Sequence, residues 1–242
     1  MGAVHTAPTL ARRKAPDTVG PMQDIQLTDP GPPDAPAPGT VDFWYEFAST
    51  YSFLAVERIE ALAAARGVGL RWRPFLLGPI FKAQGYATTP FLVHEAKGRY
   101  MWRDIERWCE RLGLPFVRPA AFPLNGLAAA RIALALPDEA RPAFTKAVYR
   151  LAFCEGRDIA DETLLAEIVR TVDVELEPAL TAARTDLVKH ALRRQTDAAA
   201  VLGIFGAPSL VTAGGELFWG NDRLDEALDW AFAEGVAKVR LP

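Results

Sequence analysis

The sequence feature that most constrains this chain is a strand-to-helix junction close to residue 49. An apolar and aromatic run, VDFWYEF, occupies residues 41–47, and a helical pattern follows it after Ser49, Thr50 and Ser52. The first N–H groups of a helix have no partner within it and the helix dipole favours negative charge, so a thiolate or another anion would be stabilised here. Serine and threonine are also preferred N-cap residues, so a purely structural role of these side chains stays open.

The junction lies inside a predicted β-α-β unit. Residues 41–47, rich in aromatic residues and free of Gly and Pro, predict the first strand. Residues 52–66 predict a helix that ends at Gly67 and Gly69, and alternation in LRWRPF, residues 70–75, predicts the second strand. Because the connections are short, we expect the two strands to be parallel.

The stretch LGPIFKAQGYATTP, residues 77–90, changes the pattern. Its Gly and Pro residues predict an irregular, mobile segment beside a strand end, where ligand contacts are often carried. Lys82 is its only cation. A lone lysine is usually a solvated surface residue, so Lys82 alone does not indicate a binding site.

From about His94 to Gly203 the sequence predicts mainly helices. Asp161 is a candidate N-cap for one of them. Apolar residues recur at helical spacing in five segments, of which the last is one helix or two: residues 97–112, 127–136, 142–155, 161–172 and 178–202.

Strand character returns near the C-terminus. GAPSLVTAGGELFWG predicts a hairpin with strands at residues 209–212 and 216–219. Asn221 or Asp222 is expected to cap a final helix that ends near Glu234.

The order β-α-β, helices, β-β-α predicts an α/β fold in which one four-stranded mixed sheet is interrupted by a large all-helical insertion. We expect the sheet domain to comprise residues 40–80 and 203–236, and the insertion residues 81–202. Residues 1–39 are rich in Pro and Ala and lack hydrophobic periodicity, so they predict a disordered arm.

Composition excludes several classes of partner. The net charge of −3 gives no indication of nucleic acid or an anionic membrane. No apolar run approaches the roughly 18 residues that span a bilayer. The basic run at residues 12–14 precedes no apolar segment, so we expect a cytoplasmic protein without a secretory signal.

Cys109 and Cys154 have neither metal nor redox spacing and are expected to be buried free thiols, although spacing alone does not exclude a disulfide.

The element order, with FGAPSL before the third strand, resembles the thioredoxin-like fold of DsbA-type oxidoreductases, which carry a helical insertion. In that superfamily the proline that matches Pro208 is cis. Where the DsbA-type redox motif has C-x-x-C, this chain has Ser49-Thr50-Tyr51-Ser52. Thiol–disulfide exchange needs a thiolate nucleophile, so that activity is not expected at this motif.

The chain is more specifically similar to the 2-hydroxychromene-2-carboxylate isomerases and the related kappa-class glutathione transferases. The resemblance implies glutathione as cofactor and Ser49 as the catalytic residue, whose hydroxyl hydrogen-bonds the glutathione sulfur and favours the thiolate. The family usually has proline after that serine, whereas this chain has Thr50, which changes the rigidity of the turn. The matching stretches, spread over about residues 41–233, are DFWYEFASTYSFLA, RPFLLGPIFKAQG, KGRYMWRDIERW, FGAPSL and FWGNDRL.

The resemblance also implies cofactor-binding roles for Lys82, Ala207, Pro208, Asn221 and Asp222. Ala207 and Pro208 would present backbone groups to the glutathione peptide, with Ala207 pairing to it as a strand does. Asn221 and Asp222 would bind the γ-glutamyl end, the Asp222 carboxylate suiting its amine and the helix N-terminus its carboxylate. Lys82 would bind the glycyl carboxylate or the acid group of the substrate.

Three functions follow from these features. The first is glutathione-dependent interconversion of 2-hydroxychromene-2-carboxylate and trans-o-hydroxybenzylidenepyruvate in aromatic (naphthalene) catabolism, through reversible thiolate addition. The second is a kappa-class-like transferase or peroxidase acting on another electrophile, since Leu92 stands where close isomerases often have asparagine. The third is a non-enzymatic thioredoxin-like binding scaffold. The isomerase reading implies a small aromatic acid as substrate and a homodimer, in which Trp102 or Trp108 belongs either to the interface or to the core.

Overall fold

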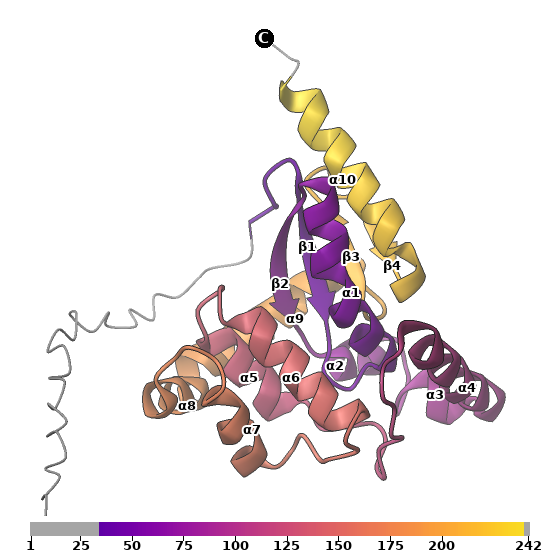
Figure 1. The fold of residues 1–242 in the computed structure, drawn as a ribbon, viewed down its shortest axis with the longest axis vertical. Coiled ribbons are helices and arrows are strands. Elements are labelled where there is room, and N and C mark those ends of the chain that lie inside the picture. Colours follow the sequence, from indigo (N-terminus) through magenta and orange to yellow (C-terminus); the bar gives the residue numbers. More distant parts are fainter. Residues whose placement is uncertain (1–33, 240–242) are drawn as a thin grey trace, which may run out of the picture.

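The computed structural model describes residues 34–239, and its centre is one mixed sheet of four strands in the order β2-β1-β3-β4 (Figure 1). The strands are β1 (Thr40–Tyr45), β2 (Gly69–Pro74), β3 (Ser209–Thr212) and β4 (Leu217–Trp219). β1 pairs parallel with β2, as predicted, and antiparallel with β3, which pairs antiparallel with β4. The predicted α/β fold, a four-stranded mixed sheet with a helical insertion, is confirmed.

Most of the chain between β2 and β3 is helical. The predicted disordered arm, residues 1–39, lies almost entirely outside the described residues, and the division into a sheet domain and an insertion at residues 81–202 stays a proposal. The helices of the described part are α1 (Thr50–Arg66), α2 (Leu77–Ala83), α3 (Pro90–Val93), α4 (Glu95–Leu112), α5 (Leu127–Ala135), α6 (Arg141–Phe153), α7 (Glu162–Val169), α8 (Leu176–Arg184), α9 (Asp186–Val201), the short 3-10 helix η1 (Asn221–Arg223) and α10 (Leu224–Val239).

Helices cover both faces of the sheet, so β1 is buried on both sides. Val41, Phe43 and Tyr45 belong to the larger core, which includes residues of α1 and α10. Trp44 points to the other face, where it shares a smaller core with Ile80 of α2 and Ala199 of α9. Figure 1 shows α1 and α10 side by side along the sheet. This packing explains why the first strand reads as a nearly continuous apolar run.

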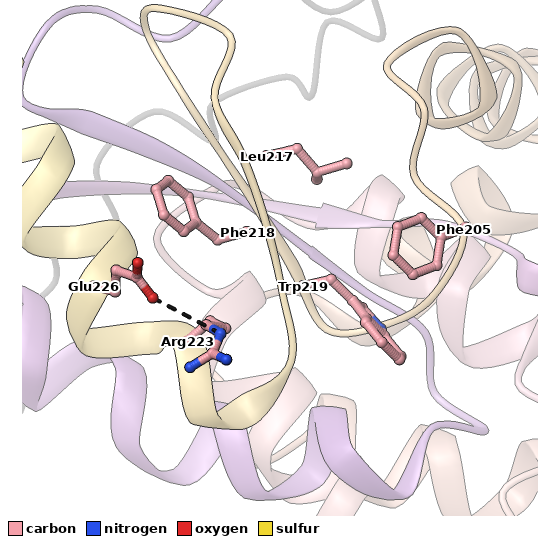
Figure 2. Close-up of a pocket in the computed structure, with 6 residues that line it drawn as sticks. All are labelled: Phe205, Leu217, Phe218, Trp219, Arg223 and Glu226. Carbon is pink, nitrogen blue, oxygen red and sulfur yellow. Dashed lines mark ion pairs between the residues drawn. The ribbon is translucent and has the colours of Figure 1, made fainter.

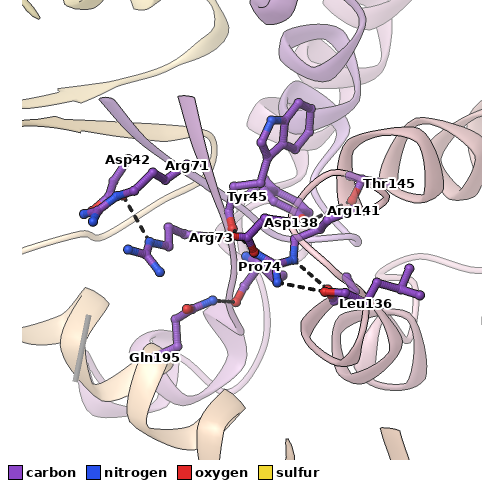
Figure 3. A network of polar contacts seen from close by, with 12 residues as sticks. Asp42, Tyr45, Arg71, Arg73, Pro74, Leu136, Asp138, Arg141, Thr145 and Gln195 are labelled. Atoms are coloured by element: carbon purple, nitrogen blue, oxygen red, sulfur yellow. Dashed lines mark hydrogen bonds and ion pairs between the residues drawn. The ribbon is translucent and has the colours of Figure 1, made fainter. Parts of the chain in front are cut away.

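A buried arginine joins the sheet to the helical region (Figure 3). Arg141, at the start of α6, donates hydrogen bonds to the carbonyls of Ala133 at 2.6 Å, Leu136 at 3.1 Å and Trp72 at 3.3 Å. Its guanidinium also pairs with Asp138 at 2.7 Å. One side chain therefore satisfies the C-terminal carbonyls of α5 and a carbonyl of β2, which ties these elements together.

One short helix occupies the start of the segment that the sequence predicted to be irregular, and a second begins at its end. α2 begins directly after β2 and contains Pro79 in its first turn, where a missing N–H breaks no intrahelical hydrogen bond. Leu77 and Ile80 of α2 are buried in the smaller core. α3 follows, capped by Thr89, whose side chain accepts from the N–H of Phe91. The prediction of an irregular segment was wrong for α2, because its buried contacts outweigh weak local propensity, whereas residues 84–89 lie in no helix or strand.

The other helix boundaries were largely predicted, with two refinements. The predicted helical stretch 178–202 is two helices, separated at Thr185, whose hydroxyl caps α9. The expected cap of the final helix at Asn221 or Asp222 was wrong, since both residues lie inside η1 and Gly220 precedes it with a φ of 123°. That backbone conformation favours glycine and turns the chain sharply into η1 and α10.

The two cysteines, and the two tryptophans of α4, are buried or half-buried. Cys109 is buried and Cys154, after α6, is half-buried, and both are free thiols. Burial raises the pKa of Cys109 to about 12. Trp102 is buried against Phe122, with ring centroids 5.0 Å apart, so it belongs to the core of the protomer. Trp108 is half-buried.

Candidate functional site

Ser49 lies where β1 passes into α1, and it is the N-cap of that helix. Its hydroxyl oxygen accepts a hydrogen bond from the N–H of Ser52 at 3.1 Å. The same hydroxyl donates to the carbonyl oxygen of Ala207 at 2.8 Å. The Ala207–Pro208 peptide bond is cis. The structure therefore joins the junction at residue 49 to the segment just before β3, and both the structural and the anion-binding readings of Ser49 are compatible with this geometry.

Asn221 and Asp222 lie on η1, which packs against α1. Asn221 is 3% exposed, and Arg58 of α1 donates to its backbone carbonyl at 3.1 Å and to its side-chain Oδ1 at 2.9 Å. Its side-chain Nδ2 is buried and has no hydrogen-bond partner within residues 34–239. Asp222 is exposed. η1 thus presents one buried amide donor and one solvated carboxylate next to α1.

Tyr51 connects the serine junction to α4. Its hydroxyl donates to Asp104 of α4 at 3.1 Å. Burial, followed by the negative charge of Asp104 and more weakly of Asp222, raises the pKa of Tyr51 above its usual range. The carboxylates of Asp104 and Asp222 therefore act on the same side chain, two residues after Ser49.

Glu46 is a buried carboxyl three residues before Ser49. Its backbone carbonyl accepts from the N–H of Ser49 at 2.8 Å and from the hydroxyl of Tyr149 at 2.7 Å. Burial raises the pKa of Glu46 to about 7, and a hydrogen bond from the backbone of Ala48 lowers it only in part. The serine junction thus follows a buried carboxyl whose pKa is close to neutral pH.

Lys82 lies apart from this group. It is exposed in the last turn of α2. Among the described residues, no hydrogen bond or ion pair joins Lys82 to Ser49, Asn221 or Asp222. The structure brings five of the six predicted residues into two neighbouring sets, Ser49 with the Ala207–Pro208 peptide and Asn221 with Asp222, and leaves Lys82 outside them.

Sequence reasoning missed Arg58 and Asp104, and a weak signal pointed to one of them. Arg58 follows Tyr51 by seven residues, so the two side chains lie on the same face of α1, and Tyr51 is part of the junction motif. Nothing in the sequence marked Asp104, because α4 carries many charged residues and only packing shows which of them face α1.

A cavity of about 300 Å³ lies beside this region (Figure 2). Phe205 and Trp219 form a T-shaped aromatic pair with ring centroids 4.8 Å apart. Arg223 and Glu226 form an ion pair at 3.7 Å on the opposite side of the cavity. The cavity is lined by Phe205, Leu217, Phe218, Trp219, Arg223 and Glu226. Its walls combine apolar and charged side chains, and none of the predicted site residues lines it.

The described residues show no alternative metal site or membrane segment. Within residues 34–239, no group of three His, Cys, Asp or Glu side chains is placed to hold a metal ion. No helix in the same range combines the length and apolar character that crossing a bilayer requires.

Comparisons with known proteins agree with the fold and point to two groups of relatives. A 2-hydroxychromene-2-carboxylate isomerase from Sphingobium xenophagum is 28% identical over 186 residues, which cover 77% of this chain and 94% of the relative. Human glutathione S-transferase kappa 1 is 28% identical over 204 residues, covering 78% of this chain and 89% of the relative. The solved structure of a 2-hydroxychromene-2-carboxylate isomerase matches with a TM-score of 0.72 and 25% identity, covering 84% of this chain and 100% of the other.

The family model for the DSBA-like thioredoxin domain matches residues 40–229, which include every strand of the sheet and the start of α10. The sequence-based prediction of a thioredoxin-like fold related to these isomerases and transferases is confirmed. The chain belongs to the family of DsbA-like thioredoxin domains.

Proposed function

We propose that this protein is a glutathione-dependent isomerase that acts on a small conjugated aromatic acid. The observation that carries the proposal is the position of the Ser49 hydroxyl, at the N-terminus of α1 and 2.8 Å from the carbonyl of Ala207. The isomerase and kappa-class transferase relatives support glutathione as the thiol. The proposed substrate pair is 2-hydroxychromene-2-carboxylate and trans-o-hydroxybenzylidenepyruvate, and the isomerase relatives are named for the first of these compounds.

The residues present fit glutathione. This tripeptide has a central thiol, peptide N–H groups, and an amino acid end that carries both a carboxylate and an amine. The orphaned Nδ2 of buried Asn221 requires an acceptor such as a carboxylate, and the exposed Asp222 carboxylate suits the amine. The Ser49 hydroxyl suits the sulfur. Lys82 is proposed to meet the glycyl or substrate carboxylate, and its exposure leaves it available to do so.

Binding would exchange the hydrogen bonds of Ser49. In the structure its hydroxyl donates to the carbonyl of Ala207. In the complex the hydroxyl would turn to the sulfur, and the Ala207 carbonyl would accept an N–H of the peptide instead, as one strand does from another. A hydrogen-bond donor directed at the sulfur favours the thiolate over the thiol. The partial positive charge at the start of α1 favours the thiolate as well.

When bound, glutathione supplies a thiolate that adds reversibly to the conjugated double bond, so that this bond can rotate before elimination restores the free thiol. Substrate and product have the same composition, so no further reactant is needed. The role of this chain is to hold the tripeptide, to keep its sulfur deprotonated through Ser49 and to place the aromatic acid against it.

The kappa-class-like transferase or peroxidase is the second candidate. Leu92, which replaces a frequent asparagine of the isomerases, lies on α3 and is 50% exposed. It offers an apolar surface where those relatives offer an amide, so a different electrophile could fit. Accumulation of a glutathione conjugate, in place of isomer interconversion, would favour this candidate. We further propose that the protein is cytoplasmic, serves aromatic catabolism and forms a homodimer, whose presence light scattering would test.

The experiment that tests the proposal combines binding and turnover. Calorimetry should show glutathione binding to the wild type, and interconversion of the substrate pair, followed by absorbance, should require added glutathione. Glutathione bound to Ser49→Ala should be deprotonated to a smaller extent than in the wild type. The variant should therefore lose about tenfold or more in kcat/KM.

Thr185→Ala is the matched control for that variant. Thr185 caps α9, accepts from the N–H of Val188 and donates to the carbonyl of Ala182, so it copies the hydrogen bonding of Ser49 at another place. Both variants should lose about 1 kcal/mol of stability through the missing cap, whereas only Ser49→Ala should lose activity. Absence of thiol binding by the wild type would support the scaffold function and reject both enzyme candidates.

A further inference from the structure

The orientation of the Asn221 side-chain amide is determined by Arg58. Arg58 is a donor only, so the side-chain atom it contacts at 2.9 Å must be the acceptor Oδ1. The other end of the amide is then the donor Nδ2, which is buried and unpartnered among the described residues. Buried donors are almost always satisfied in native proteins, and an unsatisfied one destabilises the fold. Nδ2 is therefore an unsatisfied donor that an acceptor of a ligand would satisfy.

Arg58 is itself held from three directions. Its guanidinium lies over the ring of Trp108 on α4, 5.1 Å from the ring centroid. It approaches Asp225 of α10 at 3.6 Å, and it reaches both oxygens of Asn221 with one nitrogen. The side chain is only 19% exposed. A planar guanidinium restrained in this way has little freedom, so it fixes the amide of Asn221 before any ligand arrives.

The charges around Asn221 indicate what kind of group would meet Nδ2. The positive charge of Arg58 lies directly behind the amide and favours an anionic acceptor. The next residue, Asp222, carries an exposed carboxylate, 3.8 Å from the guanidinium of Arg223, that favours a cationic group nearby. An amino acid end with a carboxylate and an amine on the same carbon matches this pair, and glutathione has such a group at its γ-glutamyl end.

We propose that Arg58 is a positioning residue that orients the Asn221 amide so that Nδ2 donates to the α-carboxylate of the γ-glutamyl end of glutathione. This inference rests on the proposed glutathione dependence and adds to it a residue of α1 that does not touch the ligand. It assigns the selectivity for that carboxylate to the Arg58–Asn221 pair.

Calorimetry with two ligands tests the assignment. The ligands are glutathione and γ-aminobutyryl-cysteinyl-glycine, which lacks only the α-carboxylate. Arg58→Met should weaken the binding of glutathione about tenfold and that of the analogue by less than about twofold. A residue that only stabilised the fold would weaken both ligands equally, so the ratio of the two Kd values separates positioning from stability.

Arg66→Met is the matched control. Arg66 lies two turns further along α1 and pairs with Asp225 at 2.8 Å and Asp229 at 2.6 Å, so it also links α1 to α10 without contacting Asn221. It should leave both Kd values within about twofold of the wild type. A loss of glutathione binding in Arg66→Met as large as in Arg58→Met would overturn the proposal.

Asn221→Asp provides a second route to the same conclusion. Its carboxylate would keep both contacts with Arg58 but would place negative charge where the ligand carboxylate is expected. This variant should fold, should bind the analogue at least as well as the wild type, and should lose glutathione binding by about tenfold or more. Equal losses for both ligands in either variant would overturn the proposal, and so would unchanged glutathione binding in Arg58→Met. If the wild type binds no glutathione at all, the proposed function fails and this inference fails with it.

Discussion

Replacing Glu46 by glutamine should change how the stability of this protein depends on pH. Glu46 is 8% exposed and follows β1 directly. Burial raises its pKa from 4.5 to about 7, because the charged carboxylate loses more hydration in the fold than the hydrogen bond from Ala48 returns. Glutamine has nearly the same shape and never ionises, so Glu46→Gln removes the titration and little else.

The direction of the effect follows from the raised pKa of Glu46. Below pH 4.5 the carboxyl is protonated in both the folded and the unfolded protein, so it has no pH-dependent effect. Between 4.5 and about 7 the unfolded chain ionises while the folded protein keeps its proton, so the free energy of unfolding falls as pH rises. At about 1.4 kcal/mol for each unit of pKa, the loss that is complete above about pH 7 is roughly 3 kcal/mol.

Urea unfolding across this pH range measures the effect. The difference in the free energy of unfolding between Glu46→Gln and the wild type should increase by about 3 kcal/mol from about pH 4.5 to 8, with unchanged m-values. Glu216→Gln, at an exposed position after β3, is the control and should follow the wild type at every pH. Parallel pH profiles for Glu46→Gln and the wild type would show that Glu46 ionises normally in the fold and would refute the reasoning.

Three further substitutions test the site and the core. Asp222→Ala should weaken glutathione binding about tenfold in calorimetry, since its carboxylate is proposed to meet the γ-glutamyl amine, and an unchanged Kd would reject that role. Arg141→Met should lower the free energy of urea unfolding by about 3 kcal/mol, because it removes the donor to three carbonyls of buried residues. Arg184→Met, at an exposed ion pair, should change it by less than about 1 kcal/mol. Phe47→Ala should cost about 3–5 kcal/mol in the same assay, because the buried ring stacks on Tyr149, and a cost below about 1 kcal/mol would contradict its place in the core.

Much of the fold was predictable because its signals are local. Alternation and aromatic content located the strands, and glycine marked the helix ends, since Gly67 and Gly113 both adopt the left-handed conformation with φ of 66°. The short helices α2 and α3 were not predictable in this way. Their segment is rich in Gly and Pro, and α2 is stabilised by burial of Leu77 and Ile80 against β1 and α9 rather than by its own propensity.

The sequence by itself determined the order of the strands and of the longer helices, the α/β class and the position of Ser49 at a helix start. These depend on periodicity and turn chemistry within short windows, and the family resemblance followed from the same motifs. Only the tertiary structure decided which polar groups meet. The contact of Ser49 with Ala207 joins residues 158 positions apart, and that of Arg58 with Asn221 joins residues 163 positions apart. Such pairs depend on how helices and strands pack in space, and neither residue of a pair carries a local signal of its partner.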